Sequence, residues 1–228
     1  MGFIRQGIAR VRYSAGWPLI SLLIVAGLLF VFGLIADEVV EGEPIALDRT
    51  VMLAFRNAAR PNTPIGPLWL LEAARDITSL GSIIVLGIVL FAVVGYLFLA
   101  RERAAAWLML GAVLGGVAMN DTLKFAFARP RPPTPAMEVF TSSFPSGHAA
   151  MSAITYLTLG AILAQTHRSI RIRVFFMSLA AILTGLVGLS RVYLGVHYPT
   201  DVLAGWCIGT AWAMGCWALM KWLRRGAI

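Results

Sequence analysis

Six long apolar stretches constrain this chain more than any other feature of its sequence. They cover residues 17–36, 79–99, 104–122, 147–164, 174–189 and 202–222. A helix needs about 20 mostly apolar residues to cross the hydrocarbon core of a bilayer, and these stretches approach that length. Charged residues make up only 13% of the chain, whereas soluble domains contain about 25%. The sequence therefore predicts an all-α, polytopic membrane protein with six transmembrane helices, folded as one domain over residues 1–228.

The first apolar stretch follows Arg5, Arg10 and Arg12, so a cleaved signal peptide is an alternative to a permanent helix. The apolar region of a signal peptide is shorter than this stretch and ends in a pattern of small residues. Residues 17–36 are not closed by such a cleavage pattern. We therefore interpret this stretch as a membrane anchor.

Basic residues indicate the direction in which the helices cross the membrane. With the N-terminus inside, every inner segment carries at least two of the chain's 19 Lys and Arg residues. The inner basic residues are then Arg5, Arg10, Arg12, Arg101, Arg103, Arg168, Arg171, Arg173, Lys221, Arg224 and Arg225. Positive residues in short loops remain on the cytoplasmic side. We therefore expect a multi-pass protein of the cell inner (plasma) membrane, with both termini in the cytoplasm.

The formal net charge of +8 could also indicate a nucleic-acid-binding protein. Such proteins gather Lys and Arg into a patch on a soluble domain, whereas here the charges alternate with apolar stretches. We therefore expect the lipid bilayer, and no nucleic acid, as the partner.

The connection at 37–78 is long for a loop without secondary structure. Apolar residues recur at helical spacing in its first half, at Leu47, Val51, Phe55 and Ala58. A second apolar piece covers 68–74. We predict short interfacial helices in this first outer loop. Two roles remain open for them: they could shape an entrance for a lipid, or they could merely cover the outer end of the bundle.

Polar residues that a membrane protein normally excludes from its spans are concentrated in three blocks. The blocks cover residues 124–132, 145–148 and 190–201. In the predicted topology all of them lie at the outer ends of spans, on one face of the membrane. Ionisable residues near a membrane are costly and usually functional, so we predict a site on this face.

The three blocks carry the chemistry of an anion site. Lys124, Arg131 and Arg191 would place positive charges close together, which is unfavourable unless an anion lies between them. The fourth and sixth spans begin on this face, and free N–H groups at a helix N-terminus bind anions. Gly147 would let a phosphate oxygen approach the backbone closely. Because arginine and lysine both bind phosphate well, the pattern predicts a phosphate pocket.

His197 and Asp201 supply a reactive pair. Their spacing of four places both side chains on one face of a helical turn, and Pro199 suits the first position of a helix. A carboxylate that accepts from one ring nitrogen fixes the tautomer and leaves the other nitrogen free to attack. His148 provides a second imidazole that could protonate a leaving oxygen.

Other interpretations of these residues are weaker. A metal site formed by His148, His197 and Asp201 is an alternative, but the neighbouring cations would repel a divalent ion. We interpret Arg129 as an exposed flank of the first block and not as a further phosphate contact. Tyr198 is interpreted as an interfacial packing residue.

The order of the blocks, K-x6-R-P, then P-S-G-H, then S-R-x5-H-x3-D, resembles the type 2 phosphatidic acid phosphatase family, which shares its site with vanadium haloperoxidases. Every position of the pattern is filled in this chain. The matching residues are Lys124, Arg131, Pro132, Pro145, Ser146, Gly147, His148, Ser190, Arg191, His197 and Asp201. One block alone is weak evidence, whereas three blocks in this order and spacing are specific.

The resemblance implies an integral-membrane phosphatase that hydrolyses a lipid phosphate or diphosphate. It implies that His197 forms a phosphohistidine, that Asp201 orients it, and that His148 is the general acid. The implied phosphate-binding residues are Lys124, Arg131, Ser146, Gly147 and Arg191. No metal and no other cofactor are implied, because fixed cations would neutralise the developing charge. The implied lipids are phosphatidate, phosphatidylglycerol phosphate, undecaprenyl diphosphate or lipid A phosphates.

Other functions remain open alongside hydrolysis. A lipid phosphotransferase would pass the phosphate from His197 to another lipid, and the sequence does not distinguish it from a phosphatase. A non-catalytic phospholipid carrier would need no pair of histidines and would carry its charges at mid-membrane. A haloperoxidase fits poorly, because membrane spans suit an amphiphile and not a halide.

Overall fold

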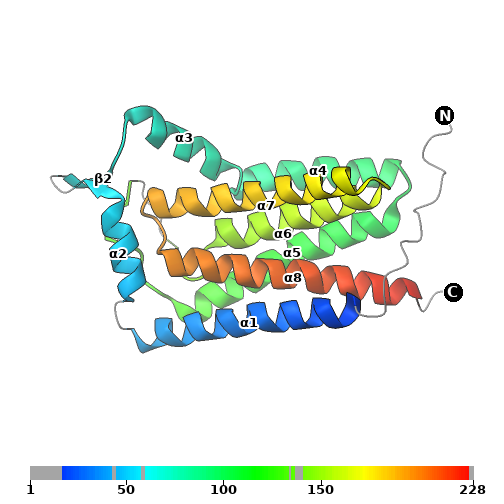
Figure 1. Cartoon of the computed structure of the whole chain (residues 1–228), viewed down its shortest axis with the longest axis horizontal. Coiled ribbons are helices and arrows are strands. Elements are labelled where there is room, and N and C mark those ends of the chain that lie inside the picture. The colour runs from blue at the N-terminus through cyan, green and yellow to red at the C-terminus, as the bar shows by residue number, and fades with distance from the viewer. Residues whose placement is uncertain (1–16, 43–44, 58–59, 134, 137–140, 226–228) are drawn as a thin grey trace.

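The structure is a computed structural model that describes residues 17–42, 45–57, 60–133, 135–136 and 141–225. Within these ranges the chain forms helices and one small antiparallel hairpin (Figure 1). The helices are α1 (Trp17–Glu41), α2 (Ala46–Ala54), α3 (Leu68–Ser79), α4 (Ile83–Leu99), α5 (Arg103–Phe127), α6 (Gly147–Gln165), α7 (Ile170–Tyr193) and α8 (Pro199–Arg225). The hairpin pairs β1 (Arg56–Asn57) with β2 (Arg60–Pro64). The predicted all-α class is confirmed.

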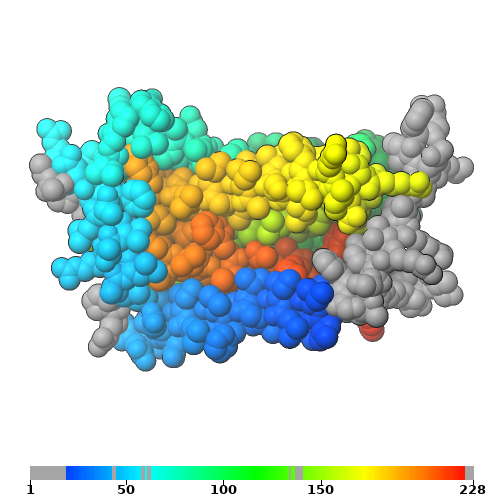
Figure 2. Space-filling model, in the orientation of Figure 1, coloured from blue at the N-terminus to red at the C-terminus, as the bar shows by residue number. Residues whose placement is uncertain are grey.

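Long helices run side by side along the molecule and form a bundle (Figure 1). Five of them, α1, α5, α6, α7 and α8, are long and apolar enough to cross a membrane singly. The pair α3 and α4, bent by 46°, adds a sixth unit of this kind, so the structure is compatible with the six predicted spans. α6 lies at the centre, where it packs against α5, α7 and α8. α1 packs on α8 at the edge of the bundle, and its surface is largely open (Figure 2).

The second predicted span begins later than expected, because the chain bends at Gly81 and Ser82. The Ser82 hydroxyl accepts a hydrogen bond from the Val85 N–H at 3.3 Å and so caps α4. Gly81 has no room for a side chain, since a Cβ there would lie 2.5 Å from Val187 on α7. The bend therefore results from a helix cap and a close helix contact.

Two glycines bring the backbones of α6 and α8 together. A Cβ at Gly205 would lie 2.7 Å from the carbonyl oxygen of Ser146. One at Gly209 would lie 2.5 Å from the carbonyl oxygen of Ala150. Small residues allow such close approach of membrane helices, and here they do so within one chain.

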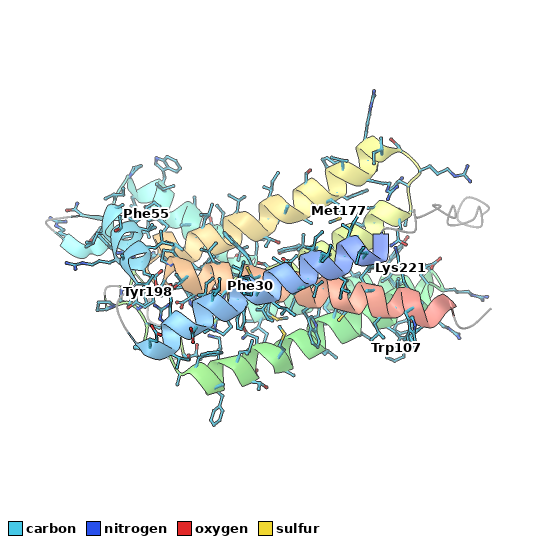
Figure 3. The ribbon with its side chains drawn as sticks, turned by 60° about the horizontal axis from the view of Figure 1, so that its bottom comes forward. Phe30, Phe55, Trp107, Met177, Tyr198 and Lys221 are labelled. Carbon is cyan, nitrogen blue, oxygen red and sulfur yellow. The ribbon has the colours of Figure 1, made fainter. Side chains whose placement is uncertain are left out.

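The first outer loop lies across one end of the bundle. α2, the β1–β2 hairpin and α3 all occupy this end (Figures 1 and 2). The prediction of short helices is confirmed, but α2 ends at Ala54 and Phe55 is its C-cap. Ala58, which we expected in the same helix, lies outside the described residues. Figure 3 shows Phe55 and Tyr198 at this end of the molecule.

The opposite end of the bundle carries the short turns of the predicted cytoplasmic side. The basic residues of the α4–α5 and α6–α7 turns lie there, and Figure 3 shows Trp107 and Lys221 at this end. Arg5, Arg10 and Arg12 lie outside the described residues, as do the side chains of Arg224 and Arg225. The described turns therefore agree with the predicted grouping of charges.

Candidate active site

The turn between α7 and α8 carries His197 on a well-defined backbone. The Gly195 N–H donates a hydrogen bond to the Val192 carbonyl at 2.9 Å. The Val196 N–H donates to the Arg191 carbonyl at 3.2 Å, which completes a glycine-based helix cap. Gly195 has a φ of 71°, a left-handed conformation that residues with a side chain disfavour. Since Val196 is fully buried, the residue that precedes His197 is anchored in the core.

Asp201 contacts His197 from the first turn of α8, which begins at Pro199 as predicted. Oδ2 of Asp201 lies 3.4 Å from Nδ1 of His197, which is longer than the ~3.2 Å limit of a formed N–H···O hydrogen bond, and Nδ1 has no hydrogen-bond partner among the described residues. The same oxygen accepts hydrogen bonds from the Tyr198 N–H at 2.9 Å and from the Ser143 hydroxyl. His197 and Asp201 are both buried. The Tyr198 N–H and the Ser143 hydroxyl thus hold the carboxylate in place, and the His197 imidazole lies beside it.

Arg131 faces the other ring nitrogen of His197. Its Nη1 lies 3.1 Å from Nε2 of His197 and donates to the Val196 carbonyl at 2.5 Å. Its other nitrogens donate to Thr141 and Ser142. An imidazole that directs its Nδ1 proton toward a carboxylate accepts a hydrogen bond at Nε2. This geometry favours the tautomer in which Nε2 carries no proton.

The first two blocks meet where α5 passes the start of α6. Nζ of Lys124 donates to the Ser142 carbonyl at 2.6 Å. A Cβ at Gly147 would lie 3.2 Å from Nδ2 of Asn120 and 3.5 Å from Cε of Lys124, so the glycine lets the helices approach. The buried Ser146 hydroxyl does not cap α6 and has no partner among the described residues. This hydroxyl and the first N–H groups of α6 are therefore suited to an anion.

Arg191 and His148 complete the cluster from α7 and α6. Nη1 of the buried Arg191 donates to the Thr78 hydroxyl at 3.1 Å, and its Nε has no partner in the described part of the chain. The His148 side chain lies close enough to the other basic groups to interact with them electrostatically, namely with Arg191, His197, Lys124 and Arg131. The structure thus brings every predicted site residue into one cluster at the end of the bundle that carries the outer loop. Their roles stay predictions.

Burial determines the protonation state of the His197 imidazole. Burial, reinforced by Arg191 and Arg131 and opposed by Asp201, lowers the pKa of His197 to about 4. Burial also lowers the pKa of Arg131. The imidazole is therefore neutral at neutral pH, which is the state in which a ring nitrogen can attack.

Arg129 is not the exposed flank that the sequence predicted. Its side chain is only 12% exposed, and it joins two carboxylates. Nη1 donates to Asp201 at 2.6 Å and Nη2 donates to Asp48 at 2.9 Å. The guanidinium also lies over the Tyr198 ring, 4.3 Å from its centroid, so Tyr198 packs against a cation. Burial alone would lower the pKa of Arg129, but Asp201 and Asp48 outweigh burial and raise it.

Sequence reasoning missed several polar residues around the cluster, namely Asp48, Thr78, Ser143 and Thr200. Asp48 and Thr78 come from the first outer loop, and their partners lie more than 80 residues further along the chain. No local motif marks either residue. The acidic character of Asp48 within an amphipathic helix was the only available signal, and it does not point to a partner.

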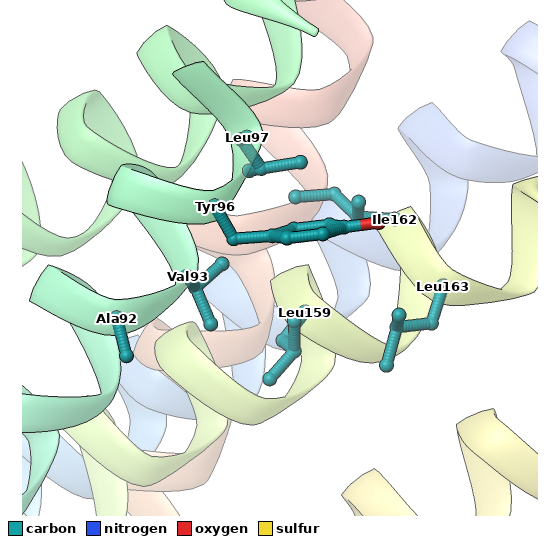
Figure 4. Close-up of a pocket in the computed structure, with 7 residues that line it drawn as sticks. All are labelled: Ala92, Val93, Tyr96, Leu97, Leu159, Ile162 and Leu163. Carbon is teal, nitrogen blue, oxygen red and sulfur yellow. The ribbon is translucent and has the colours of Figure 1, made fainter. Parts of the chain in front are cut away.

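The alternative metal site does not form in the described part of the chain, and a cavity lies apart from the cluster. Within the described ranges, no group of three or more His, Cys, Asp or Glu side chains could hold a metal ion, so the alternative metal site is not found there. A cavity of about 330 Å³ lies between α4 and α6 (Figure 4). It is lined by Tyr96 and by aliphatic residues near the opposite end of these helices. Because it contains no charged side chain, it is not an anion site.

Comparison with known proteins agrees with these observations. A family model described as the PAP2 superfamily matches residues 105–225, a range that contains all three polar blocks. Phosphatidylglycerophosphatase B of Bacillus subtilis (strain 168) is 33% identical over 143 residues, which cover 62% of this chain and 70% of that protein. Decaprenylphosphoryl-5-phosphoribose phosphatase of Mycobacterium tuberculosis is 32% identical over 146 residues, which cover 61% of this chain and 75% of that protein.

A solved structure is similar over most of the chain. It is the crystal structure of a transmembrane PAP2 type phosphatidylglycerolphosphate phosphatase from Bacillus subtilis, with a TM-score of 0.77 and 26% identity. The similarity covers 87% of this chain and 96% of that chain. The resemblance drawn from the three blocks is thereby confirmed. This chain belongs to the PAP2 superfamily and is a multi-pass membrane phosphatase of lipid phosphates.

Proposed function

We propose that this phosphatase hydrolyses a lipid phosphate or diphosphate through a phosphohistidine formed at His197. The observation that carries the proposal is the environment of the two ring nitrogens. Asp201 lies 3.4 Å from Nδ1, and Nη1 of Arg131 lies 3.1 Å from Nε2. A carboxylate on one side and a phosphate-binding cation on the other suit a histidine that attacks phosphorus.

In the first step, Nε2 of neutral His197 bonds to phosphorus while the bond from phosphorus to the leaving oxygen breaks. Asp201 stabilises the positive charge that develops on the ring. His148, in its protonated form, gives its proton to the leaving oxygen and becomes neutral. The lipid alcohol, or a lipid phosphate when the substrate is a diphosphate, then departs.

The phosphoryl oxygens are bound by fixed positive groups. Lys124, Arg131 and Arg191 supply the cations, and Ser146 and Gly147 supply a hydroxyl and the helix N-terminus. Arg131 already touches Nε2, so its guanidinium would remain beside the transferred group throughout the reaction. No cofactor takes part in this scheme.

In the second step, neutral His148 accepts a proton from a water molecule. The water oxygen bonds to phosphorus, and the bond from phosphorus to Nε2 breaks. Inorganic phosphate leaves, His197 is again neutral, and His148 is again protonated. Attack by a lipid hydroxyl in place of water would make the same site a phosphotransferase.

We place the site on the periplasmic or outer side of the membrane. The described basic turns at the opposite end of the bundle support this orientation, since such turns stay cytoplasmic. The substrate would then be a lipid of the outer leaflet. The names of the relatives point to lipids of the phosphatidylglycerol phosphate and polyprenyl phosphate classes.

The experiment is a phosphate-release assay on purified enzyme in detergent. The panel contains phosphatidate, phosphatidylglycerol phosphate, undecaprenyl diphosphate and a lipid A phosphate. We expect free phosphate from at least one lipid, an acid-labile phosphoenzyme after rapid quenching, and neither product from His197→Ala. His167→Ala is the matched control, because His167 is exposed at the opposite end of the bundle. Phosphate transfer to another lipid without free phosphate would contradict hydrolysis, and a phosphoenzyme in His197→Ala would contradict the nucleophile.

A further inference from the structure

The first outer loop contacts the reactive turn through Asp48. This residue lies in α2 and is only 3% exposed. Its Oδ1 accepts a hydrogen bond from the Thr200 N–H at 2.9 Å, and its Oδ2 accepts from the Thr200 hydroxyl at 2.7 Å. Thr200 is the second residue of α8 and directly precedes Asp201. Asp48 therefore caps the helix N-terminus that carries the catalytic carboxylate, where a negative charge is also favoured by the helix dipole.

The same carboxylate also binds Arg129. Nη2 of Arg129 donates to Oδ2 of Asp48 at 2.9 Å, while Nη1 donates to Oδ1 of Asp201 at 2.6 Å. Nη1 lies 3.0 Å from the Thr200 hydroxyl as well, so the four side chains form a closed network. One arginine is thus shared between a carboxylate of the outer loop and the carboxylate that faces His197.

The sharing has an electrostatic consequence for His197. Asp201 must keep enough negative charge to stabilise the imidazole when Nε2 attacks. An arginine bound to Asp201 alone would withdraw that charge. Because Arg129 binds Asp48 as well, its positive charge is shared between two carboxylates, and it meets Asp201 at Oδ1 while Oδ2 faces the His197 side of the site. Removal of Asp48 would also leave Arg129 partly unpaired in a buried position, which favours a closer contact with Asp201.

We propose that Asp48 is a positioning residue for the nucleophile, and that α2 belongs to the catalytic apparatus and is not merely a cover of the bundle. Asp48 fixes the start of α8 through its hydrogen bonds to Thr200. It also shares the positive charge of Arg129, so that less of this charge acts on Asp201. The side-chain hydrogen bonds of Asp48 run to Thr200 and Arg129 and not to His197, so it acts through these partners. This inference rests on the proposed phosphohistidine mechanism and extends it to the first outer loop.

The proposal predicts a loss that affects attack at phosphorus and does not depend on the leaving group. Asp48→Asn keeps the shape and an acceptor for the Thr200 N–H but removes the charge. Rapid-mix single-turnover kinetics, with enzyme in excess over 4-nitrophenyl phosphate or a lipid phosphate, measure the phosphorylation rate constant. Titration with vanadate counts the intact sites. We expect the rate constant to fall by about tenfold to hundredfold with both substrates, while KM and the number of vanadate-binding sites stay unchanged.

Asp76→Asn is the matched control, since Asp76 is an exposed carboxylate on α3 in the same loop, and it should react at the wild-type rate. Asp48→Asn with wild-type kinetics would overturn the proposal. A loss explained entirely by fewer vanadate-binding sites would also overturn it, because that result indicates a purely structural role. If Asp48→Asn does not fold, Thr200→Val decides: it removes one hydroxyl of the network and should slow phosphorylation several-fold, and a wild-type rate contradicts the proposal.

Failure of the proposed function has a different signature. In that case wild-type enzyme forms no phosphoenzyme, or His197→Ala retains one, and the inference falls with the mechanism. When wild type and His197→Ala behave as proposed, Asp48→Asn tests the inference alone.

Discussion

Ser146, which precedes α6, is joined to Asp201, in the first turn of α8, backbone to backbone: the Ser146 N–H donates to the Asp201 carbonyl at 3.0 Å. The proposed phosphate-binding residue and the residue proposed to orient His197 therefore share one hydrogen bond. The distance between the two helix N-termini is set by the close contact of α6 with α8. The alignment of His197 with the proposed phosphate pocket thus depends on packing inside the bundle.

Gly205→Ala should disturb that alignment. The new Cβ would lie 2.7 Å from the Ser146 carbonyl oxygen, which belongs to rigid backbone, so α6 and α8 must separate. Overpacking of this kind costs about 1–3 kcal/mol, and a misplaced nucleophile should lower kcat further. Gly215→Ala in the same helix is the control, because nothing lies within 4 Å of its Cβ. Melting temperature in detergent and kcat check both variants; equal behaviour of the two would contradict the packing argument.

The two imidazoles should divide the reaction between them. His197→Ala should remove turnover on every substrate, because in the proposed mechanism no other group forms the bond to phosphorus. His148→Ala should cost on the order of 10²–10⁴-fold with a lipid monophosphate, whose alcohol needs a proton to leave. A nitrophenolate leaves without that proton, so phosphorylation by an aryl phosphate should fall least and a burst should precede slow turnover. Rapid-mix kinetics measure both steps. Equal losses in phosphorylation on the two substrates would show that His148 is not the acid.

Acid should destabilise the protein through His197. Its pKa is about 4 in the folded protein and 6.5 when unperturbed, so the unfolded chain binds more protons between these values. The contribution of this group is therefore complete above pH 6.5 and is lost as the pH falls toward 4. We expect the melting temperature in detergent to fall between pH 7 and pH 5, and to fall less in His197→Asn, which cannot titrate. Parallel curves for the two proteins would contradict the assigned pKa.

The site should be accessible from outside the cell. Met137, between the first two polar blocks, lies outside the described residues, so the probe is placed at the exposed Thr63 in β2. In a background without Cys207 and Cys216, Thr63→Cys should react with a membrane-impermeant thiol reagent in intact cells. His167→Cys, in the turn at the other end, should react only after lysis. The reverse pattern would invert the topology and move the active site to the cytoplasm.

Chelators should leave the phosphatase rate unchanged, and vanadate should inhibit competitively. In the proposed mechanism, Lys124, Arg131 and Arg191 supply the positive charge that a divalent ion would otherwise bring. A vanadate oxyanion can occupy the same groups and bond to Nε2 of His197. Activity lost in chelator and restored by one particular divalent metal would contradict the phosphohistidine mechanism.

Much of this protein could be predicted from short-range patterns. The six spans follow from runs of apolar residues, because each helix satisfies its own backbone hydrogen bonds and must be apolar along its length. The three polar blocks follow from spacing within single turns, as with His197 and Asp201. Positive charge in short turns predicted that all three blocks meet at one end, and the structure brings them together there. The family and the activity class implied by these blocks are confirmed by the comparisons.

Only the tertiary structure decided which distant side chains pair with the residues of the three polar blocks. Asp48 meets Thr200 across 152 positions of sequence and Arg191 meets Thr78 across 113, and no local pattern encodes such pairs. Arg129 was predicted to be an exposed flank of the first block. It is buried because α2 folds back over the start of α8 and supplies a second carboxylate. A sequence records which residues can bear charge, whereas the pairing of those charges depends on helix packing that places distant segments within hydrogen-bonding distance.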